Sequence, residues 1–317
     1  MSDLSTLLRE YADSAPPIQQ PEIAHGRQRR RARPVIYAGV AFATIAAVVG
    51  GVAGTRNDSQ QTSRVATRSP APCGRAVGCP VAAGQFLYFE SDALASIGEG
   101  WTDKTGAAHQ ISTLVPQHRE IWLAPDGSGR LAETAGQPTF VSPQDRAEWV
   151  ARGSDATTLN VPAPSDQRFG PHGLAWIDTT HLPTTDLEAL RVALNRVDGG
   201  TPSPGEDFVH VGDMLRETNA SRELREALYR FALTIPGVKQ LTDAKDHSGR
   251  PGIGVAYSSA GFENDLILDP NSFMLLGEQS KVVGPNQAGR AVGTEQGWTV
   301  YLRSGIVGSV TAVPSGG

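Results

Sequence analysis

The hydrophobic pattern of the chain begins with one long uncharged stretch. Residues 35–54, VIYAGVAFATIAAVVGGVAG, contain no charged side chain. A helix of about 20 residues is about 30 Å long, which matches the hydrocarbon core of a bilayer. The pattern therefore predicts one transmembrane helix. Arginines crowd the positions just before it, and such clusters stay on the cytoplasmic side; they are Arg27, Arg29, Arg30, Arg31 and Arg33.

This topology places residues 1–34 in the cytoplasm as a short head and sends the C-terminal part out of the cell. A cleaved secretory signal ending near Val52-Ala53-Gly54 is the alternative. The apolar stretch and the region before it are both longer than in an ordinary signal peptide, so we favour a membrane anchor in the cell membrane. Either way the bulk of the chain is exported.

Small residues recur at every fourth position along the predicted span, at Gly39, Ala43, Ala47 and Gly51. Such a stripe lets two helices approach closely, which would permit a homodimer through the span. The alternative is that Ala and Gly are simply abundant throughout this chain.

Residues 2–14 have the spacing of an amphipathic helix, with an apolar stripe formed by Leu4, Leu7, Leu8 and Tyr11. An isolated helix of this length is not stable in water, so the stripe requires a surface. We expect it to dock on a cytoplasmic regulatory protein, because its acidic side chains disfavour the anionic inner leaflet. A terminal helix without a partner is the alternative.

Residues 55–84 are polar and contain no aromatic side chain, which is typical of an extracytoplasmic tether. They hold the two cysteines of the chain, Cys73 and Cys79, whose spacing matches neither a C-x-x-C redox pair nor a zinc site. In an oxidising compartment this pair predicts a disulfide, with a free thiol pair as the alternative. Because the tether lies outside the predicted core, we expect the disulfide to contribute little to stability.

From residue 85 onward the pattern alternates between the period of strands and that of helices. It predicts strands, then helices, then an antiparallel meander. The predicted strands are 85–91, 120–124, 130–134, 174–178, 238–241, 252–258, 262–268, 273–283 and 297–310, and the predicted helices are 142–150, 186–194, 208–218 and 221–234. Residues 154–173 are expected to form a long loop. The prediction is one α+β domain over residues 85–317, a curved antiparallel sheet packed on central helices and preceded by one transmembrane helix.

The charges divide at the predicted span. Residues 1–34 hold six arginines and four acidic residues, whereas the chain from Thr55 onward holds 22 basic and 29 acidic residues. An acidic exported domain argues against nucleic acid as its partner.

No motif of known chemistry stands out. None of the seven histidines lies three or four positions from another, and the chain has no zinc spacing, calcium loop, G-x-S-x-G elbow or phosphate-binding glycine loop. We therefore predict no catalytic residue, no metal site and no cofactor, and expect that the protein is not an enzyme.

Several segments together carry a resemblance to a known group. With the arginine run and the span, they make the chain resemble a group of uncharacterised actinobacterial single-pass membrane proteins along nearly its whole length; the segments are LLREYADSAPP, EIWLAPDGSGR, FVHVGDMLRET, LREALYRFALTIPGV, GRPGIGVAY and LILDPNSFMLLGE. The resemblance implies one span and an exported C-terminal domain, and it supplies no catalytic residues. Genes of that group often lie beside those of alternative sigma factors, which suits envelope signalling.

Two functions follow as hypotheses. The first is a sensing or interaction module in envelope signalling, whose outer domain reads an envelope state while the head contacts a regulator. The alternative is a domain tethered to the bilayer that binds a hydrophobic ligand such as a lipid, because a curved sheet closed by helices can enclose an apolar groove. A purely structural role is the third hypothesis.

Overall fold

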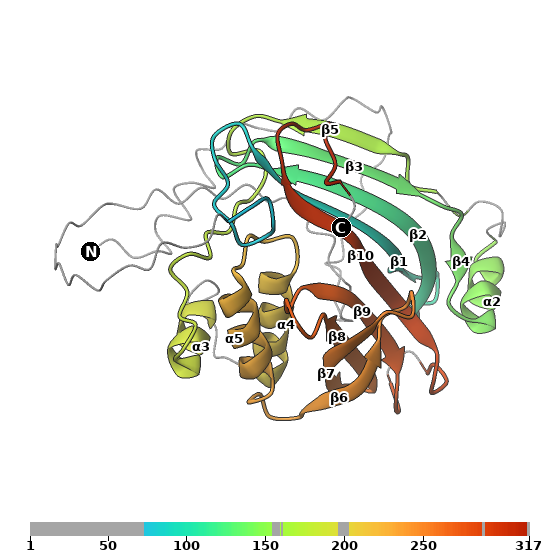
Figure 1. The fold of residues 1–317 in the computed structure, drawn as a ribbon. Coiled ribbons are helices and arrows are strands. Elements are labelled where there is room, and N and C mark those ends of the chain that lie inside the picture. Colours follow the sequence, from blue (N-terminus) through green and yellow to red (C-terminus); the bar gives the residue numbers. More distant parts are fainter. Residues whose placement is uncertain (1–72, 154–158, 160, 196–202, 287–288, 316–317) are drawn as a thin grey trace, which may run out of the picture. The chain divides into compact units, whose positions relative to one another are not determined.

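The computed structural model describes residues 73–153, 159, 161–195, 203–286 and 289–315 (Figure 1). Three predicted parts lie outside these residues: the span, the head that was expected in the cytoplasm with its stripe of Leu4, Leu7, Leu8 and Tyr11, and the tether up to residue 72. Within the described ranges, no helix combines the length and the apolar character needed to cross a bilayer.

The core of the structure is a ten-stranded antiparallel sheet. Its main path has the order β5-β3-β2-β1-β10-β9-β8-β7-β6, and the short β4 pairs with β2 beside this path. The strands are β1 Phe86–Thr102, β2 Ala108–Leu123, β3 Gly129–Ala135, β4 Thr139–Phe140, β5 Ser165–Phe169, β6 Val238–Lys245, β7 Pro251–Ser259, β8 Phe262–Leu268, β9 Leu275–Val282 and β10 Glu295–Val307. The first strand and the last are neighbours, with Phe86 opposite Val307, and this pairing joins the two halves of the sheet.

The described helices begin at positions that their sequences mark. They are α2 Pro143–Ala151, α3 Leu187–Asn195, α4 Pro204–Leu215 and α5 Arg222–Ala232. Ser142, Ser203 and Ser221 cap α2, α4 and α5 by accepting hydrogen bonds from backbone N–H groups in the first turn. These caps satisfy donors that a helix start would otherwise leave unpaired, so the starts are locally encoded.

Helices α3 to α5 pack together against β7, β8 and β9 and form the largest apolar cluster. Leu228 and Val211 are fully buried there against Val255 and Leu268. Helix α2 lies apart from this cluster, beside the C-terminal end of β1 and the N-terminal end of β2 (Figure 1). The described part is thus mostly a large antiparallel sheet with a few helices, as the α+β prediction requires.

The first hairpin is longer than predicted. The strand expected at 85–91 continues to Thr102, and its partner β2 begins at Ala108. The Asp103 carboxylate closes the turn by accepting hydrogen bonds from the backbone N–H groups of Thr105 and Ala107. In the half of this hairpin nearest the turn, polar residues and glycines interrupt the alternation of apolar and polar positions. The sequence pattern therefore did not predict that the strands extend so far.

Two further predictions between residues 154 and 178 are wrong. Part of the expected long loop forms the edge strand β5, which pairs with β3. The expected strand at 174–178 has no ladder partner; instead the Leu174 N–H donates to the Gly127 carbonyl while its side chain is buried. Apolar residues in this segment reflect packing against the β2–β3 turn and not membership of the sheet.

Candidate functional site

Residues 216–220 connect α4 to α5, and side chains of this α4–α5 connection contact several parts of the fold. The Arg216 Nε atom donates to the Glu278 carboxylate on β9 at 2.7 Å. The Tyr301 hydroxyl on β10 donates to the same carboxylate at 2.8 Å. The Glu278 side chain is only 2% exposed, so its charge depends on these two donors. Burial, together with this carboxylate, raises the pKa of Tyr301 well above its ordinary value, and Tyr301 therefore stays a donor.

Glu217 reaches the other half of the sheet. Its two carboxylate oxygens accept from Nε and Nη2 of Arg119 on β2, at 2.8 and 3.1 Å, in the two-point geometry that guanidinium and carboxylate favour. Arg119 also donates to Glu133 on β3. The connection is therefore bound to β2 and β3 through Glu217 and to β9 and β10 through Arg216.

The Glu217 backbone is strained. Its φ angle is 25°, in a region that residues with a Cβ atom rarely adopt. Such a conformation costs about 1–3 kcal/mol and persists only where surrounding contacts impose it. The ion pair with Arg119 is one contact that holds this residue, and the hydrogen bonds of its neighbours Arg216 and Thr218 are others.

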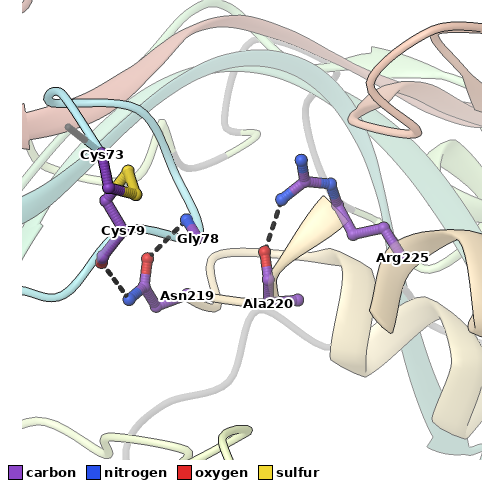
Figure 2. Close-up of a disulfide and its surroundings, with 6 residues drawn as sticks. All are labelled: Cys73, Gly78, Cys79, Asn219, Ala220 and Arg225. Carbon is purple, nitrogen blue, oxygen red and sulfur yellow. Dashed lines mark hydrogen bonds between the residues drawn. A yellow bond between two sulfur atoms is a disulfide. The ribbon is translucent and has the colours of Figure 1, made fainter. Parts of the chain in front are cut away.

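Asn219 binds the segment that we name the disulfide loop, residues 73–84. Its side-chain oxygen accepts from the Gly78 N–H at 2.8 Å, and its nitrogen donates to the Cys79 carbonyl at 2.8 Å. Figure 2 shows the Asn219 amide pointing at the loop. Gly78 has a φ angle of 95°, and a Cβ atom there would lie 3.0 Å from the Ser221 Cα, so this close approach requires glycine.

The predicted disulfide is present, because Cys73 and Cys79 are bonded with a Cα–Cα distance of 5.6 Å. The expectation that it lies outside the core is wrong. Cys79 is 5% exposed and packs in an apolar cluster with Leu87, Phe89, Ile121 and Ile306. The Ile306 N–H on β10 also donates to the Arg75 carbonyl at 2.7 Å. The folded domain therefore includes residues 73–84 and does not begin at Gln85.

A buried guanidinium fixes the other side of the connection. Arg225 on α5 is 4% exposed and donates to the Ser272 carbonyl. It also donates to the Ala220 carbonyl, as Figure 2 shows. Burial lowers the pKa of Arg225 to about 10, which leaves the side chain charged at neutral pH. The carbonyl that ends the connection is thus held by a charge-assisted hydrogen bond.

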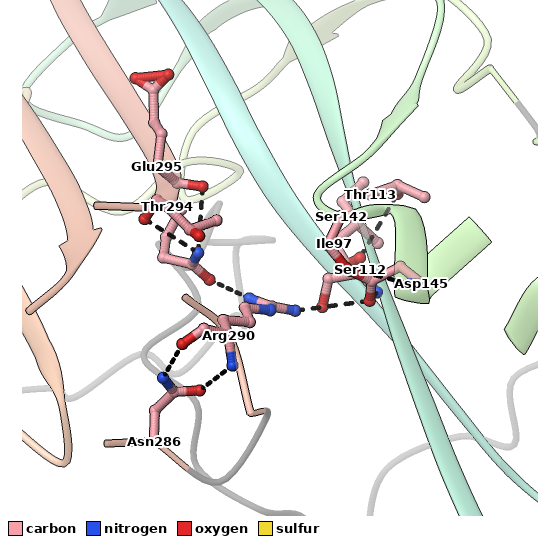
Figure 3. A network of polar contacts seen from close by, with 10 residues as sticks. Ile97, Ser112, Thr113, Ser142, Asp145, Asn286, Arg290, Thr294 and Glu295 are labelled. Carbon is pink, nitrogen blue, oxygen red and sulfur yellow. Dashed lines mark hydrogen bonds and ion pairs between the residues drawn. The ribbon is translucent and has the colours of Figure 1, made fainter. Parts of the chain in front are cut away.

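A second polar network holds the start of α2. The Asp145 carboxylate accepts from the Ser112 N–H at 2.7 Å and lies 3.9 Å from the Arg290 guanidinium. The Asn286 side chain donates to the Arg290 carbonyl and accepts from the Arg290 N–H. The Arg290 guanidinium also donates to the Gln296 side chain. Figure 3 shows Arg290 between β10 and α2, so this network joins the loop after β9 to α2 and β2.

Among the predicted site residues, the structure brings Cys73 and Cys79 together, and the head stripe lies outside the described residues. Sequence reasoning missed the α4–α5 connection. Its only signal was a polar run, RETN, directly after the apolar face of α4. In the described part of the chain, no three His, Cys, Asp or Glu side chains are grouped so that they could hold a metal ion.

No protein-family model matches the chain, and no curated protein matches it. Its function is therefore inferred from the geometry of these contacts.

Proposed function

We propose that this protein is a single-pass, membrane-anchored sensing module in envelope signalling, and that the α4–α5 connection couples its outer domain to the chain leading toward the membrane. One observation carries the proposal. Arg216, the strained Glu217 and Asn219, within four consecutive positions, bind β9, β2 and the disulfide loop respectively.

The coupling follows from how such contacts respond to a disturbance. The Arg119–Glu217 pair is half-buried and held by two hydrogen bonds in a fixed geometry, and both are lost together when one partner moves away, so the contact favours discrete arrangements over gradual ones. If the sheet shifts and the pair opens, the strained Glu217 backbone relaxes. Asn219, which lies two residues further along the chain, then moves with it. The disulfide loop, held by Asn219, then changes its docking. Along the sequence this loop leads back through the tether to the predicted span at 35–54 and the head.

The proposal is tested in cells with the full-length protein carrying a photo-crosslinking amino acid at Tyr11. The wild type should crosslink to a defined cytoplasmic protein, and the double variant Leu7→Asp with Leu8→Asp should lose that product. Asn219→Ala, which loosens the disulfide loop, should change the yield. Gln167→Ala removes an exposed amide from β5 and should leave the yield unchanged.

Equal yields for the wild type, Asn219→Ala and Gln167→Ala would refute the coupling. Equal yields for the wild type and the leucine double variant would refute docking of the head. The two parts of the proposal can therefore fail separately.

Hydrophobic-ligand binding is the second candidate, and a pocket between α3, α4 and α5 favours it. Its volume is about 470 Å³, and Leu187, Phe231 and Ile235 line it together with Arg191 and Asp207. This volume lies in the range of small-molecule sites, about 300–1,000 Å³. The lining suits a small amphiphile, whereas the large apolar side chains under the helices already pack against one another. Native mass spectrometry of the full chain should show a bound amphiphile if this function holds, and only the ligand-free mass if it does not.

A further inference from the structure

The far end of the β1–β2 hairpin contacts α2 through one histidine. His109 on β2 uses both ring nitrogens. Its Nε2 atom lies 3.1 Å from the Asp103 carboxylate in the hairpin turn, and its Nδ1 atom lies 3.1 Å from the Glu148 carboxylate on α2. The ring is 29% exposed and therefore only partly screened by water.

A second cation reinforces the same contact. Arg152, directly after α2, pairs with Glu99 on β1. Its guanidinium carbon lies 4.9 Å from the centre of the Trp101 ring and 5.2 Å from that of Trp149, within reach of cation–π attraction. Trp101 in turn stacks on His109, with ring centres 5.4 Å apart and planes 10° apart.

The two carboxylate contacts dictate the charge of His109. A neutral imidazole carries one N–H, so it can donate to only one partner and would present a lone pair to the other carboxylate. Both contacts are hydrogen bonds only when the ring is an imidazolium. In agreement, hydrogen bonds to Asp103 and Glu148 raise the pKa of His109.

We propose that His109 is a pH-sensitive clasp that holds the C-terminal half of α2 to the β1–β2 hairpin through both carboxylates when protonated and through at most one when neutral, which loosens this contact. The charged groups that face the clasp are Asp103 and Glu99 from the hairpin and Glu148 and Arg152 from α2 and its end. The start of α2 stays anchored by Asp145, so the helix pivots about its N-terminus and uncovers Trp149.

The direction of the effect follows from linkage. Because the folded pKa of His109 lies above the ordinary histidine value, the clasp is complete below that ordinary value and is lost as the pH rises through the folded pKa. The exported domain would thus loosen α2 on alkalinisation. The clasp lies apart from the α4–α5 connection and stands independently of the function proposed above.

Hydrogen exchange of the full-length protein in nanodiscs tests the clasp, with protection factors corrected for intrinsic rates between about pH 5.5 and about pH 8.5, a window that brackets histidine titration. In the wild type, protection of residues 146–151 should fall severalfold across this range while that of α5 stays constant. In His109→Gln it should be low at both ends. His181→Gln, whose side chain is 71% exposed, should behave like the wild type.

Constant protection of α2 in the wild type, or a pH profile shared by the wild type and His109→Gln, would overturn the proposal. If His109→Gln does not fold, a second measurement on the wild type and on Glu148→Gln tests the clasp. Histidine ring resonances in the wild type should titrate with a raised pKa at His109, and Glu148→Gln should lower that value. An unchanged His109 titration in Glu148→Gln would also overturn the clasp.

Discussion

Removing the Asn219 side-chain amide should undock the disulfide loop. Asn219→Ala deletes two hydrogen bonds of 2.8 Å, one from the Gly78 N–H and one to the Cys79 carbonyl. Each such bond contributes about 1 kcal/mol net, and a buried group left without a partner adds about 1 kcal/mol more. Cys79 is 5% exposed, so its carbonyl has little access to water once Asn219 is truncated. We therefore expect a loss of about 2–3 kcal/mol in the free energy of unfolding.

Thermal unfolding of the full-length oxidised protein measures this loss. For a domain of this size, 1 kcal/mol corresponds to about 2–4 °C in Tm, so Asn219→Ala should lower Tm by about 5–10 °C. Gln167→Ala, which removes an exposed amide from β5, is the matched control and should leave Tm unchanged. Because Asn219 and the disulfide act on the same loop, Asn219→Ala combined with Cys73→Ser should lower Tm by less than the two single changes added together.

A decrease below about 1 °C, smaller than one net hydrogen bond would give, would show that Asn219 does not hold the loop. Fully additive changes would show that the disulfide and Asn219 stabilise separate parts of the fold. Either result would also remove the basis for the proposed coupling between the sheet and the segment that precedes the disulfide loop.

Three further outcomes follow from the structure and the sequence. Glu217→Gly should be more stable in urea than Glu217→Ala by about 1 kcal/mol, because glycine relieves the strained backbone while both lose the ion pair; equal stabilities would contradict strain at this position. Glu278→Ala should cost about 1.5–3 kcal/mol by the same assay, since it removes the buried acceptor of the Arg216 guanidinium and of the Tyr301 hydroxyl while Arg216 keeps its pair with Asp213; a cost under about 1 kcal/mol would show that these bonds contribute little to stability. Periplasm-type reporters fused after Gly317 should be active, and recovery of a soluble form beginning near Thr55 would refute a retained anchor.

Local signals account for the elements that the sequence predicted well. Serine caps precede α2 and α5 in the chain, so their starts could be predicted within a few residues. The turns of the C-terminal meander carry glycine, asparagine or proline, and β7, β8 and β9 lie within two residues of their predicted bounds. The disulfide was predicted because the sequence has two cysteines, closely spaced, in a segment that was expected to be exported.

The contacts that the sequence did not predict join segments that lie far apart along the chain. Arg119 and Glu217 lie 98 positions apart, and nothing in the pattern of either segment marks them as partners. Charged residues are ordinarily assigned to the solvent, so hydrophobic periodicity cannot reveal a buried carboxylate such as Glu278, which pairs with Arg216. The disulfide loop was misjudged for the same reason, since its apolar contacts come from β1, β2 and β10.

Because β1 pairs with β10, β1 lacks one of its two neighbouring strands during biosynthesis until the end of the chain has been made. Phe86 finds Val307 about 220 positions later, so at about 5–20 residues per second β1 spends on the order of 10–40 s without its second neighbour. A nascent chain in that interval presents a long unpaired edge, which is prone to pair with other chains. Truncation before β10 would make that exposure permanent, and we expect such fragments to aggregate or be degraded instead of folding as a smaller domain.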